Sequence, residues 1–315
     1  MTYTRLATTL CGIHLKNPVL AASGTFGYGI EFEKILDLNS LGGIVTKGLS
    51  REPIAGNPAP RLWHAVGGMM NSVGLQNVGV TAFVRDKLPK LRSYSVPIFA
   101  NVFGYAVEDY VEVVRELENA EGIAGYELNV SCPNTKHGGM FFSSDPGLLS
   151  DLVSRVRTIA RRPLIVKLSP NVASIEPLAQ AAEQAGADAI SLINTLVSLA
   201  IDPATRKSRI GAGYGGLSGP AIKPLALRLV HQTAQAVKIP IIGLGGIVSG
   251  LDAAEFLVAG ASAVQVGTAT FIDPRAPVLI AGQLNHVVGK LALTDIQDLT
   301  GKIECREFIR SCRAQ

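Results

Sequence analysis

Charged residues are scarce in this sequence of 315 residues. Asp, Glu, Lys and Arg make up only 17%, and the net charge at pH 7 is +4. The basic residues are scattered, apart from a mild cluster near the end of the chain at Arg306, Arg310 and Arg313. Proteins that bind nucleic acid or anionic membranes usually concentrate Lys and Arg on one face. The composition therefore predicts neither partner, and an anionic cofactor or substrate accounts for the small basic excess.

Cysteine is also scarce. The four cysteines, at positions 11, 132, 305 and 312, form no CxxC pair and no metal-ligand spacing. The five histidines, at positions 14, 64, 137, 231 and 286, form no metal pattern either. We therefore expect no bound metal, and four reduced thiols in a cytoplasmic protein.

Long hydrophobic runs are missing. Residues 1–18 lack the continuous apolar stretch of a signal peptide. The most apolar segment, residues 256–272, is broken by Gly, Ser, Thr and Gln and is too short for a confident membrane span. We expect a soluble protein with no membrane attachment.

What the sequence does contain is a regular alternation. Hydrophobic residues make up 47%, with 33 glycines, which favours a compact α/β protein rich in loops. Short apolar runs typical of strands buried on both faces occur at residues 18–22, 43–46, 97–102, 126–130, 164–168, 189–193, 240–244 and 263–266. Amphipathic segments of helical length lie between many of them, at 107–119, 146–160, 175–185 and 221–237. Eight such units predict a single (β/α)8 TIM barrel domain covering residues 1–315.

Two connections are longer than a plain barrel needs. Residues 49–79 follow the second strand and residues 196–220 follow the sixth, and both are rich in Gly, Pro and Asn. We expect both extended loops on the C-terminal face of the barrel, where barrel enzymes build their active sites.

Polar residues or glycines follow all eight predicted strands. Each has an ordinary interpretation, because glycines form turns and a lone lysine is usually a solvated charge. Their occurrence at every strand end, with two lysines in apolar surroundings, indicates a functional site. In chain order they are Ser23-Gly24, Lys47-Gly48, Asn101, residues 129–134, Lys167, Asn194-Thr195, Gly245-Gly246 and Gly267-Thr268.

The last two strand ends predict a phosphate site. Gly245-Gly246 and Gly267-Thr268 offer unhindered backbone N–H groups, and each is expected to precede a helix whose N-terminus favours an anion. Residues 211–216 match the GxGxxG pattern, but no clear strand precedes them, so we interpret this segment as a flexible loop. The cofactor is thus a mononucleotide, and Asn101, Asn129 and Lys167 are candidates to face its isoalloxazine or ribityl group.

Cys132 is the candidate reactive residue. A lone cysteine is most often a small buried hydrophobic residue, an interpretation we keep for the other three. Cys132 instead lies between Ser131 and Pro133 on a polar loop beyond a strand end. No histidine follows a strand end, which leaves Cys132 for proton transfer, although an unperturbed thiol has a pKa of about 8.5.

Together these motifs resemble dihydroorotate dehydrogenase of class 1, and specifically the catalytic subunit of class 1B. The resemblance runs from about residue 6 to residue 289. Further motifs that carry it are Thr46-Lys47-Gly48, Gly56-Asn57-Pro58, residues 71–77 (NSVGLQN), residues 166–171 (VKLSPN), Ile193-Asn194-Thr195 and residues 215–220 (GGLSGP).

The resemblance implies a set of site residues and one FMN per chain. FMN would be held by Ser23, Lys47, Gly48, Asn101, Asn129, Lys167, Ile193, Gly219, Gly245, Gly246, Gly267 and Thr268. Dihydroorotate would contact Lys47, Asn71, Ser72, Val73, Gly74, Leu75, Asn129, Asn134, Asn194 and Thr195. Cys132 would remove a proton from substrate C5 while a hydride leaves C6 for the flavin, giving orotate in pyrimidine biosynthesis.

The resemblance also implies partners. FAD and a 2Fe–2S cluster are expected on a second subunit that passes electrons to NAD+, because this chain lacks cysteines with ligand spacing. A homodimeric core flanked by two such subunits would make a heterotetramer. Alternatives are another pyrimidine-specific flavin barrel, such as the matching domain of dihydropyrimidine dehydrogenase, a non-catalytic flavin electron carrier, and a phosphate-binding isomerase without flavin.

Overall fold

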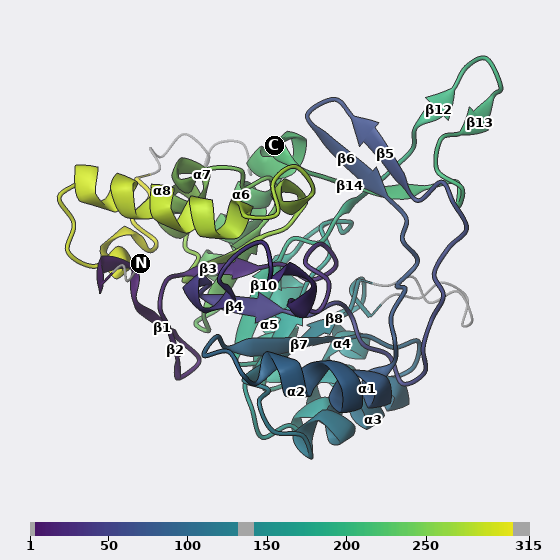
Figure 1. Cartoon of the computed structure of the whole chain (residues 1–315), viewed down its shortest axis with the longest axis horizontal. Coiled ribbons are helices and arrows are strands. Elements are labelled where there is room, and N and C mark those ends of the chain that lie inside the picture. Colours follow the sequence, from purple (N-terminus) through teal and green to yellow (C-terminus); the bar gives the residue numbers. More distant parts are fainter. Residues whose placement is uncertain (1–3, 132–141, 305–315) are drawn as a thin grey trace.

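Eight parallel strands form a closed barrel at the centre of the molecule (Figure 1). The computed structural model describes residues 4–131 and 142–304. The barrel order is β10-β15-β16-β3-β4-β7-β8-β9, and β16 pairs with β3 through Val264 and Val19. Each predicted apolar run overlaps one of these strands, so the predicted (β/α)8 barrel is confirmed. The strands are β3 (Val19–Ala21), β4 (Gly43–Val45), β7 (Ile98–Val102), β8 (Gly125–Asn129), β9 (Leu164–Lys167), β10 (Ala189–Leu192), β15 (Ile241–Leu244) and β16 (Ala263–Val266).

Helices surround the strands (Figure 1). The four predicted helices are present, each shorter by one to three residues at one or both ends. They are α3 (Val107–Glu118), α4 (Pro146–Arg157), α5 (Glu176–Gln184) and α6 (Lys223–Ala236). The structure adds α1 (Val80–Ala82), the π-helical η4 (Phe83–Lys87), α2 (Leu88–Leu91), α7 (Gly250–Val258) and α8 (Ala276–Lys290). Short 3-10 helices are η1 (Thr4–Leu6), η2 (Ile30–Phe32), η3 (Leu38–Ser40), η5 (Pro220–Ile222), η6 (Thr268–Phe271) and η7 (Ile296–Leu299).

Two hydrophobic layers stabilise the barrel. The larger lies between the outward side chains of the strands and the inward faces of the helices. The smaller fills the N-terminal end of the barrel interior with side chains such as Leu20, Phe99 and Ile165. A hairpin of β1 (Thr8–Leu10) and β2 (Ile13–Leu15) adds Leu10 and Leu15 to this inner layer. The hairpin thus closes the barrel at the end opposite the strand C-termini.

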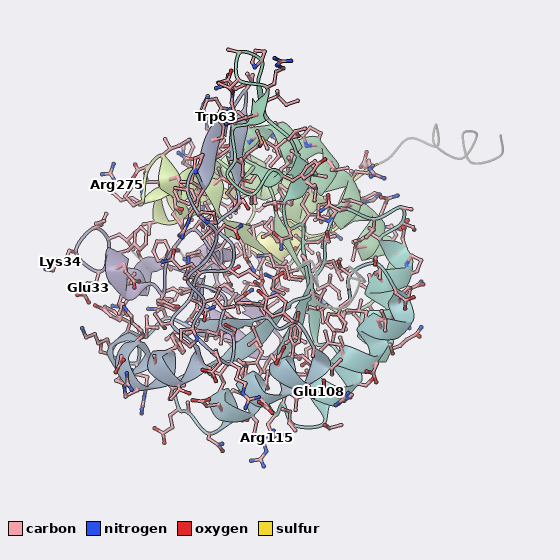
Figure 2. All side chains as sticks on the ribbon, turned by 90° about the vertical axis from the view of Figure 1, so that its right-hand side faces the viewer. Glu33, Lys34, Trp63, Glu108, Arg115 and Arg275 are labelled. Atoms are coloured by element: carbon pink, nitrogen blue, oxygen red, sulfur yellow. The ribbon has the colours of Figure 1, made fainter. Side chains whose placement is uncertain are left out.

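The two long connections contain a second sheet. Residues 49–79 include β5 (Leu62–Ala65) and β6 (Gly68–Asn71), and residues 196–220 include β11 (Leu196–Ser198) and β14 (Gly215–Ser218). These strands form an antiparallel sheet in the order β11-β14-β6-β5. A ribbon of β12 (Ile201–Asp202) and β13 (Lys207–Ser208) extends beyond it. Figure 1 shows this region projecting from the barrel, and Figure 2 places Trp63 within the projection, far from Glu108 and Arg115.

The interpretation of residues 211–216 as a flexible loop is wrong at its C-terminal end. Gly215 and Gly216 belong to β14 and pair with β6 and β11. A Cβ on Gly216 would lie 2.0 Å from Oγ1 of Thr195, so the strand requires glycine there. Glycine is normally a weak strand former, and the pairing of β14 with β6 joins segments more than 140 residues apart. Within the described residues, no helix has the length and apolar character needed to cross a membrane.

Candidate active site

A cavity of about 660 Å³ opens at the C-terminal ends of the barrel strands, beneath the second sheet. Its volume is typical of a site for a cofactor or small molecule. Every predicted catalytic or binding residue lines this cavity, except two that lie outside the described residues, Cys132 and Asn134. The predicted residues on its wall are Ser23, Lys47, Gly48, Asn71, Ser72, Val73, Gly74, Leu75, Asn101, Asn129, Lys167, Ile193, Asn194, Thr195, Gly219, Gly245, Gly246, Gly267 and Thr268.

The floor of the cavity is a polar layer inside the barrel. Alternate residues of a strand face the same side, so one strand supplies both an apolar residue at the closed end and a polar residue two positions later. The apolar members include Phe99, Ile165, Ala189 and Ala263. The polar residues two positions after these four, together with one from β8, are Asn101, Lys167, Ser191, Gln265 and Glu127, and all are buried.

Glu127 is the residue of this floor that the sequence interpretation missed, together with Ser191 and Gln265. It lies in the predicted strand at 126–130, where we considered only the residues that follow the strand. The available signal was the alternation itself, because a carboxylate within an otherwise apolar, fully buried strand must face polar partners. Its side chain is fully buried and forms an ion pair with the ammonium of Lys167, N to O 3.4 Å.

Three glycines at the cavity wall have backbone conformations that other residues rarely adopt. Gly219, Gly245 and Gly246 have φ values of +97°, +128° and +79°. A Cβ on any of them would come within 2.8 Å of neighbouring atoms. Backbone conformation and close packing therefore require glycine at these three positions of the cavity wall.

A helix was predicted to begin after each of the two glycine motifs, and the structure shows a different arrangement at each. Gly245-Gly246 precedes α7, whose N-terminus is capped by the Ser249 hydroxyl, which accepts from the N–H of Asp252 at 3.2 Å. Gly267-Thr268 opens only the short 3-10 helix η6, and α8 begins several residues later. Of these two helix starts, α7 alone offers an α-helical N-terminus directly after its motif.

Lys47 is a half-buried cation without a partner among the described residues. Its ammonium makes no hydrogen bond or ion pair there, although its backbone N–H donates to Gly27 at 2.8 Å. Burial lowers the pKa of Lys47, the nearby Arg61 lowers it further, and Glu31 acts in the opposite direction. A half-buried, unpaired ammonium at a cavity wall is a site for an anion.

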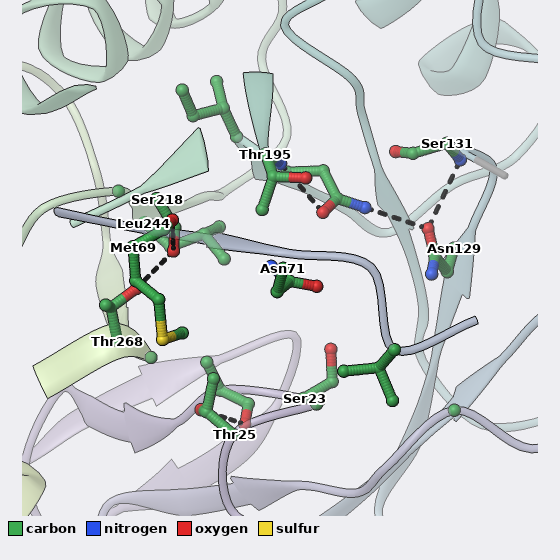
Figure 3. A pocket seen from close by; sticks show the side chains of 18 of the residues that line it. Ser23, Thr25, Met69, Asn71, Asn129, Ser131, Thr195, Ser218, Leu244 and Thr268 are labelled. Carbon is green, nitrogen blue, oxygen red and sulfur yellow. Dashed lines mark hydrogen bonds between the residues drawn. The ribbon is translucent and has the colours of Figure 1, made fainter. Parts of the chain in front are cut away.

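Amide groups form a chain along one wall of the cavity (Figure 3). Asn194 donates through Nδ2 to Oδ1 of Asn129 at 3.2 Å, and its own Oδ1 accepts from the N–H of Thr195 at 2.9 Å. The N–H of Ser131 also donates to Oδ1 of Asn129, at 3.3 Å. The chain fixes the orientation of both amides, which gives the wall a defined pattern of donors and acceptors.

The opposite wall is formed by the connection after β4. Asn57 donates through Nδ2 to the Ser72 hydroxyl at 2.8 Å, and Leu75 has a left-handed backbone with φ +59°. Asn71 donates to the carbonyl of Gly216 on β14 at 3.3 Å. Near the mouth, Thr268 donates to Ser218 Oγ at 2.8 Å, as Figure 3 shows. Hydrogen bonds thus hold residues 71–75 over the cavity.

Cys11 lies away from the cavity. Its thiol donates to the carbonyl of Asp188 at 3.3 Å, and burial, followed by the charge of Asp188, raises its pKa to about 12. Cys11 is thus a partly buried packing residue, as predicted. Cys305 and Cys312 lie outside the described residues. Among the described residues, no group of three or more His, Cys, Asp and Glu side chains is placed to hold a metal ion.

Comparison with known proteins agrees with the family predicted from the motifs. The model of the dihydroorotate dehydrogenase family matches residues 5–288. A relative from Solibacter usitatus, provisionally named dihydroorotate dehydrogenase A (fumarate), is 66% identical over 95% of this chain and 99% of its own. Relatives from Geotalea uraniireducens and Geobacter sulfurreducens, both named dihydroorotate dehydrogenase B (NAD(+)), catalytic subunit, are 51% and 50% identical over 95% of this chain and 98% of their own. The predicted resemblance is confirmed: the chain belongs to the dihydroorotate dehydrogenase family.

Proposed function

We propose that this chain is the catalytic subunit of a class 1B dihydroorotate dehydrogenase, which oxidises (S)-dihydroorotate to orotate in the biosynthesis of UMP. The observation that carries the proposal is the convergence of the predicted cofactor and substrate residues on one cavity at the C-terminal end of the barrel. We further propose that residues 1–315 form one domain and that the protein acts in the cytoplasm.

The cavity fits FMN, one per chain. Gly219, Gly245 and Gly246 line the cavity in backbone conformations that require glycine, and the backbone N–H groups of Gly245-Gly246 and Gly267-Thr268 would bind the phosphate. Oε1 of Gln265 is buried without a hydrogen-bond partner among the described residues, and it suits an N–H of the flavin ring. Ser23, Lys47, Gly48, Asn101, Asn129, Lys167, Ile193, Gly267 and Thr268 would complete the FMN site. When bound, FMN supplies the hydride acceptor.

The remaining wall fits the substrate. The unpaired ammonium of Lys47 would bind the carboxylate of dihydroorotate, and the ordered amides of Asn129 and Asn194 would pair with the edge of the pyrimidine ring. An amide wall of this kind rejects analogues that lack the matching polar groups. Asn71, Ser72, Val73, Gly74, Leu75 and Thr195 would close around the ring, together with Asn134.

Cys132 would be the general base. It follows Ser131 at the edge of the cavity, and it would take the proton from substrate C5 while the hydride leaves C6. One proton and one hydride leave the substrate, which gives the double bond of orotate. The Asn129–Asn194 pair would hold the ring so that both C–H bonds are aligned with their acceptors.

Electrons would leave through a second subunit carrying FAD and a 2Fe–2S cluster, which would reduce NAD+. The names of the relatives that are about 50% identical support this acceptor. A heterotetramer would then contain two copies of this chain and two electron-transfer subunits. The name of the relative that is 66% identical favours a second candidate, a class 1A enzyme that reduces fumarate.

The first experiment tests flavin and substrate together. The purified chain should be yellow, should release FMN on denaturation, and should show a shift in its flavin absorbance when titrated with orotate. Dihydroorotate should bleach the flavin under anaerobic conditions, whereas dihydrouracil, which lacks the carboxylate, should not. A colourless protein would contradict the proposal, and bleaching by dihydrouracil alone would favour a different pyrimidine as the substrate.

A further inference from the structure

The carboxylate of Glu127 lies in the polar layer beneath the cavity and accepts four hydrogen bonds. Oε1 accepts from Nδ2 of Asn101 at 2.7 Å and from Nζ of Lys167 at 3.4 Å. Oε2 accepts from the Ser191 hydroxyl at 2.9 Å and from Nε2 of Gln265 at 2.6 Å. The five residues come from β7, β8, β9, β10 and β16, so this one carboxylate joins five strands of the barrel.

The donors around Glu127 determine how it can act. An ammonium and an amide nitrogen can only donate, so three of the four partners require an acceptor. An ionised carboxylate accepts on both oxygens and donates from neither, which matches this set of donors. Glu127 thus places one negative charge beside the positive charge of Lys167, and the buried surroundings strengthen the interaction between them.

Glu127 also sets the direction of two amides. Because it binds Nδ2 of Asn101 and Nε2 of Gln265, the carbonyl oxygens of both side chains are left for other partners. Oδ1 of Asn101 lies beside Gly48 at the cavity wall, 3.0 Å from where a Cβ on that glycine would be. Oε1 of Gln265 has no hydrogen-bond partner among the described residues. The floor therefore presents acceptors, which match a ligand with a ring N–H.

We propose that Glu127 is a positioning residue for the cofactor site: its carboxylate holds the ammonium of Lys167 and turns the amides of Asn101 and Gln265 so that their oxygens accept from the ligand. It also partly neutralises the positive charge beneath the flavin and so keeps the reduction potential of the bound flavin low. The inference rests on the proposed FMN site, and it concerns a residue that does not itself touch substrate.

The variant Glu127→Gln removes the charge with little change in size, and it also removes the acceptor that fixes the amide of Gln265. The new amide can keep its oxygen toward Asn101 and Lys167. On the other side, Gln265 can rotate its amide and Ser191 can accept instead of donate. Reduced flavin carries more negative charge, and an uncompensated Lys167 would stabilise it. We expect the midpoint potential of bound FMN, measured by anaerobic dye equilibration, to rise. The ratio of reduced to oxidised flavin should increase at least about tenfold, which is about 30 mV for a two-electron couple.

Two control variants separate charge from packing. Ser191→Ala removes one hydrogen bond to the carboxylate but keeps the charge, and Glu127→Asp keeps the charge on a shorter side chain. In both variants, the midpoint potential of bound FMN should stay close to that of the wild type. If Glu127→Gln loses FMN, a flavin-bearing Glu127→Asp variant with a wild-type potential supports the same conclusion.

Several outcomes would overturn the inference. They are an unchanged potential in Glu127→Gln, an equal shift in Ser191→Ala, and unfolding of both Glu127 variants in a circular dichroism melt. Unfolding of both variants would mean that Glu127 only stabilises the barrel core. Each outcome is distinct from failure of the proposed function, in which the wild-type chain itself would bind no flavin.

Discussion

At the scale of single residues, the barrel interior departs from the usual filling of Val, Ile and Leu. Its closed end keeps apolar side chains such as Phe99 and Ile165. Its open end carries Glu127, Lys167 and Gln265, each almost completely buried. Burying polar groups is costly unless they are paired, and the hydrogen bonds around Glu127 pair most of them, while Oε1 of Gln265 has no partner among the described residues. The single-residue predictions concern the groups that would act on the substrate.

Cys132 is the first such residue. Cys132→Ser should keep FMN bound but lower turnover by about 100- to 10,000-fold, because a positioned general base contributes that much. Turnover of the wild type should rise with pH toward the pKa of the thiol. Cys11→Ser is the matched control and should turn over normally, because the Cys11 thiol has a pKa of about 12 and bonds the Asp188 carbonyl. A Cys132→Ala variant with nearly wild-type rates would refute the assignment.

Lys47 gives a pH-dependent prediction for binding. An anion binds the ammonium form, and burial lowers the pKa of Lys47, so the affinity for orotate should fall as pH rises through a value below the usual lysine range. Lys47→Met should weaken orotate binding by about 10- to 100-fold, the size of a hydrogen bond to a charged group, and should remove this pH dependence. Fluorescence titration of the flavin would measure both effects.

The matched control is Lys16→Met. Lys16 is exposed and donates to the carbonyl of Asn39 and the hydroxyl of Ser95, away from the cavity. The Lys16→Met substitution should leave orotate binding unchanged at every pH. If Lys47→Met binds orotate like the wild type, the unpaired ammonium does not serve the substrate.

At the scale of the elements, the start of α7 combines a cap with a buried ion pair. Oδ2 of Asp252 accepts from the N–H of Val248 at 3.0 Å and from the Ser249 hydroxyl at 2.8 Å. Oδ1 accepts from Nζ of Lys223 at 2.6 Å. Burial alone would raise the pKa of Asp252, but these hydrogen bonds outweigh it and lower the pKa below the usual range. The cap thus fixes the segment after Gly245-Gly246 that would hold the phosphate.

Asp252→Asn should lower the free energy of unfolding at pH 7 by about 1–3 kcal/mol. Because the pKa of Asp252 is lower in the folded state, its carboxylate stabilises the fold above the unfolded pKa of about 3.9, and this contribution is lost as pH falls through the folded pKa. Urea unfolding of the two proteins should therefore differ clearly at neutral pH and converge in acid. Glu255→Gln, a more exposed partner of Lys223, should cost less. A difference that persists unchanged in acid would exclude this mechanism.

The elements also show what sequence could and could not predict. The barrel strands were predictable because a strand buried on both faces is a continuous apolar run, as at residues 164–167 and 263–266. The same continuity concealed the interior position of Glu127, because such a run does not reveal which face points inward. Strand β14 was not predictable, since glycine is a weak strand former and Gly216 also pairs with Asn71, far away along the chain. The part of the cavity wall formed by strand ends was predictable, because a barrel places all strand ends on one face. Residues 71–75 and Gly219 were predicted only through the family resemblance.

At the scale of the whole molecule, the projecting sheet carries much exposed apolar surface. Val66 is 96% exposed and Val197 is 66% exposed, and Trp63, Tyr214 and Ile201 are also exposed. Exposed apolar surface on one projection is typical of an assembly interface. We therefore assign the proposed homodimer contact to this sheet.

The double variant Val66→Glu and Val197→Glu should convert the dimer into a monomer that still binds FMN. Light scattering coupled to size-exclusion chromatography would measure the mass. Leu291→Glu, at the end of α8 and also exposed, should leave the mass unchanged. A double variant that remains dimeric would exclude the sheet as the contact.

The electron acceptor is also a property of the assembly. The isolated chain should contain FMN without iron, and it should reduce artificial acceptors far faster than NAD+. Adding the electron-transfer subunit should restore NAD+ reduction by dihydroorotate. Efficient NAD+ reduction by the isolated chain would contradict the class 1B assignment, and efficient fumarate reduction would support the class 1A alternative.

The closure of the barrel between its first and last strands has a consequence for biosynthesis. Val19 pairs with Val264, so the ring of strands is incomplete until more than four-fifths of the chain has left the ribosome. The hydrogen bond between Thr268 and Ser218 of β14 also forms late, because Thr268 must be synthesised first. Bringing such distant segments together is the slow part of folding. The cavity therefore lacks part of its wall until Gly267 and Thr268 have been synthesised.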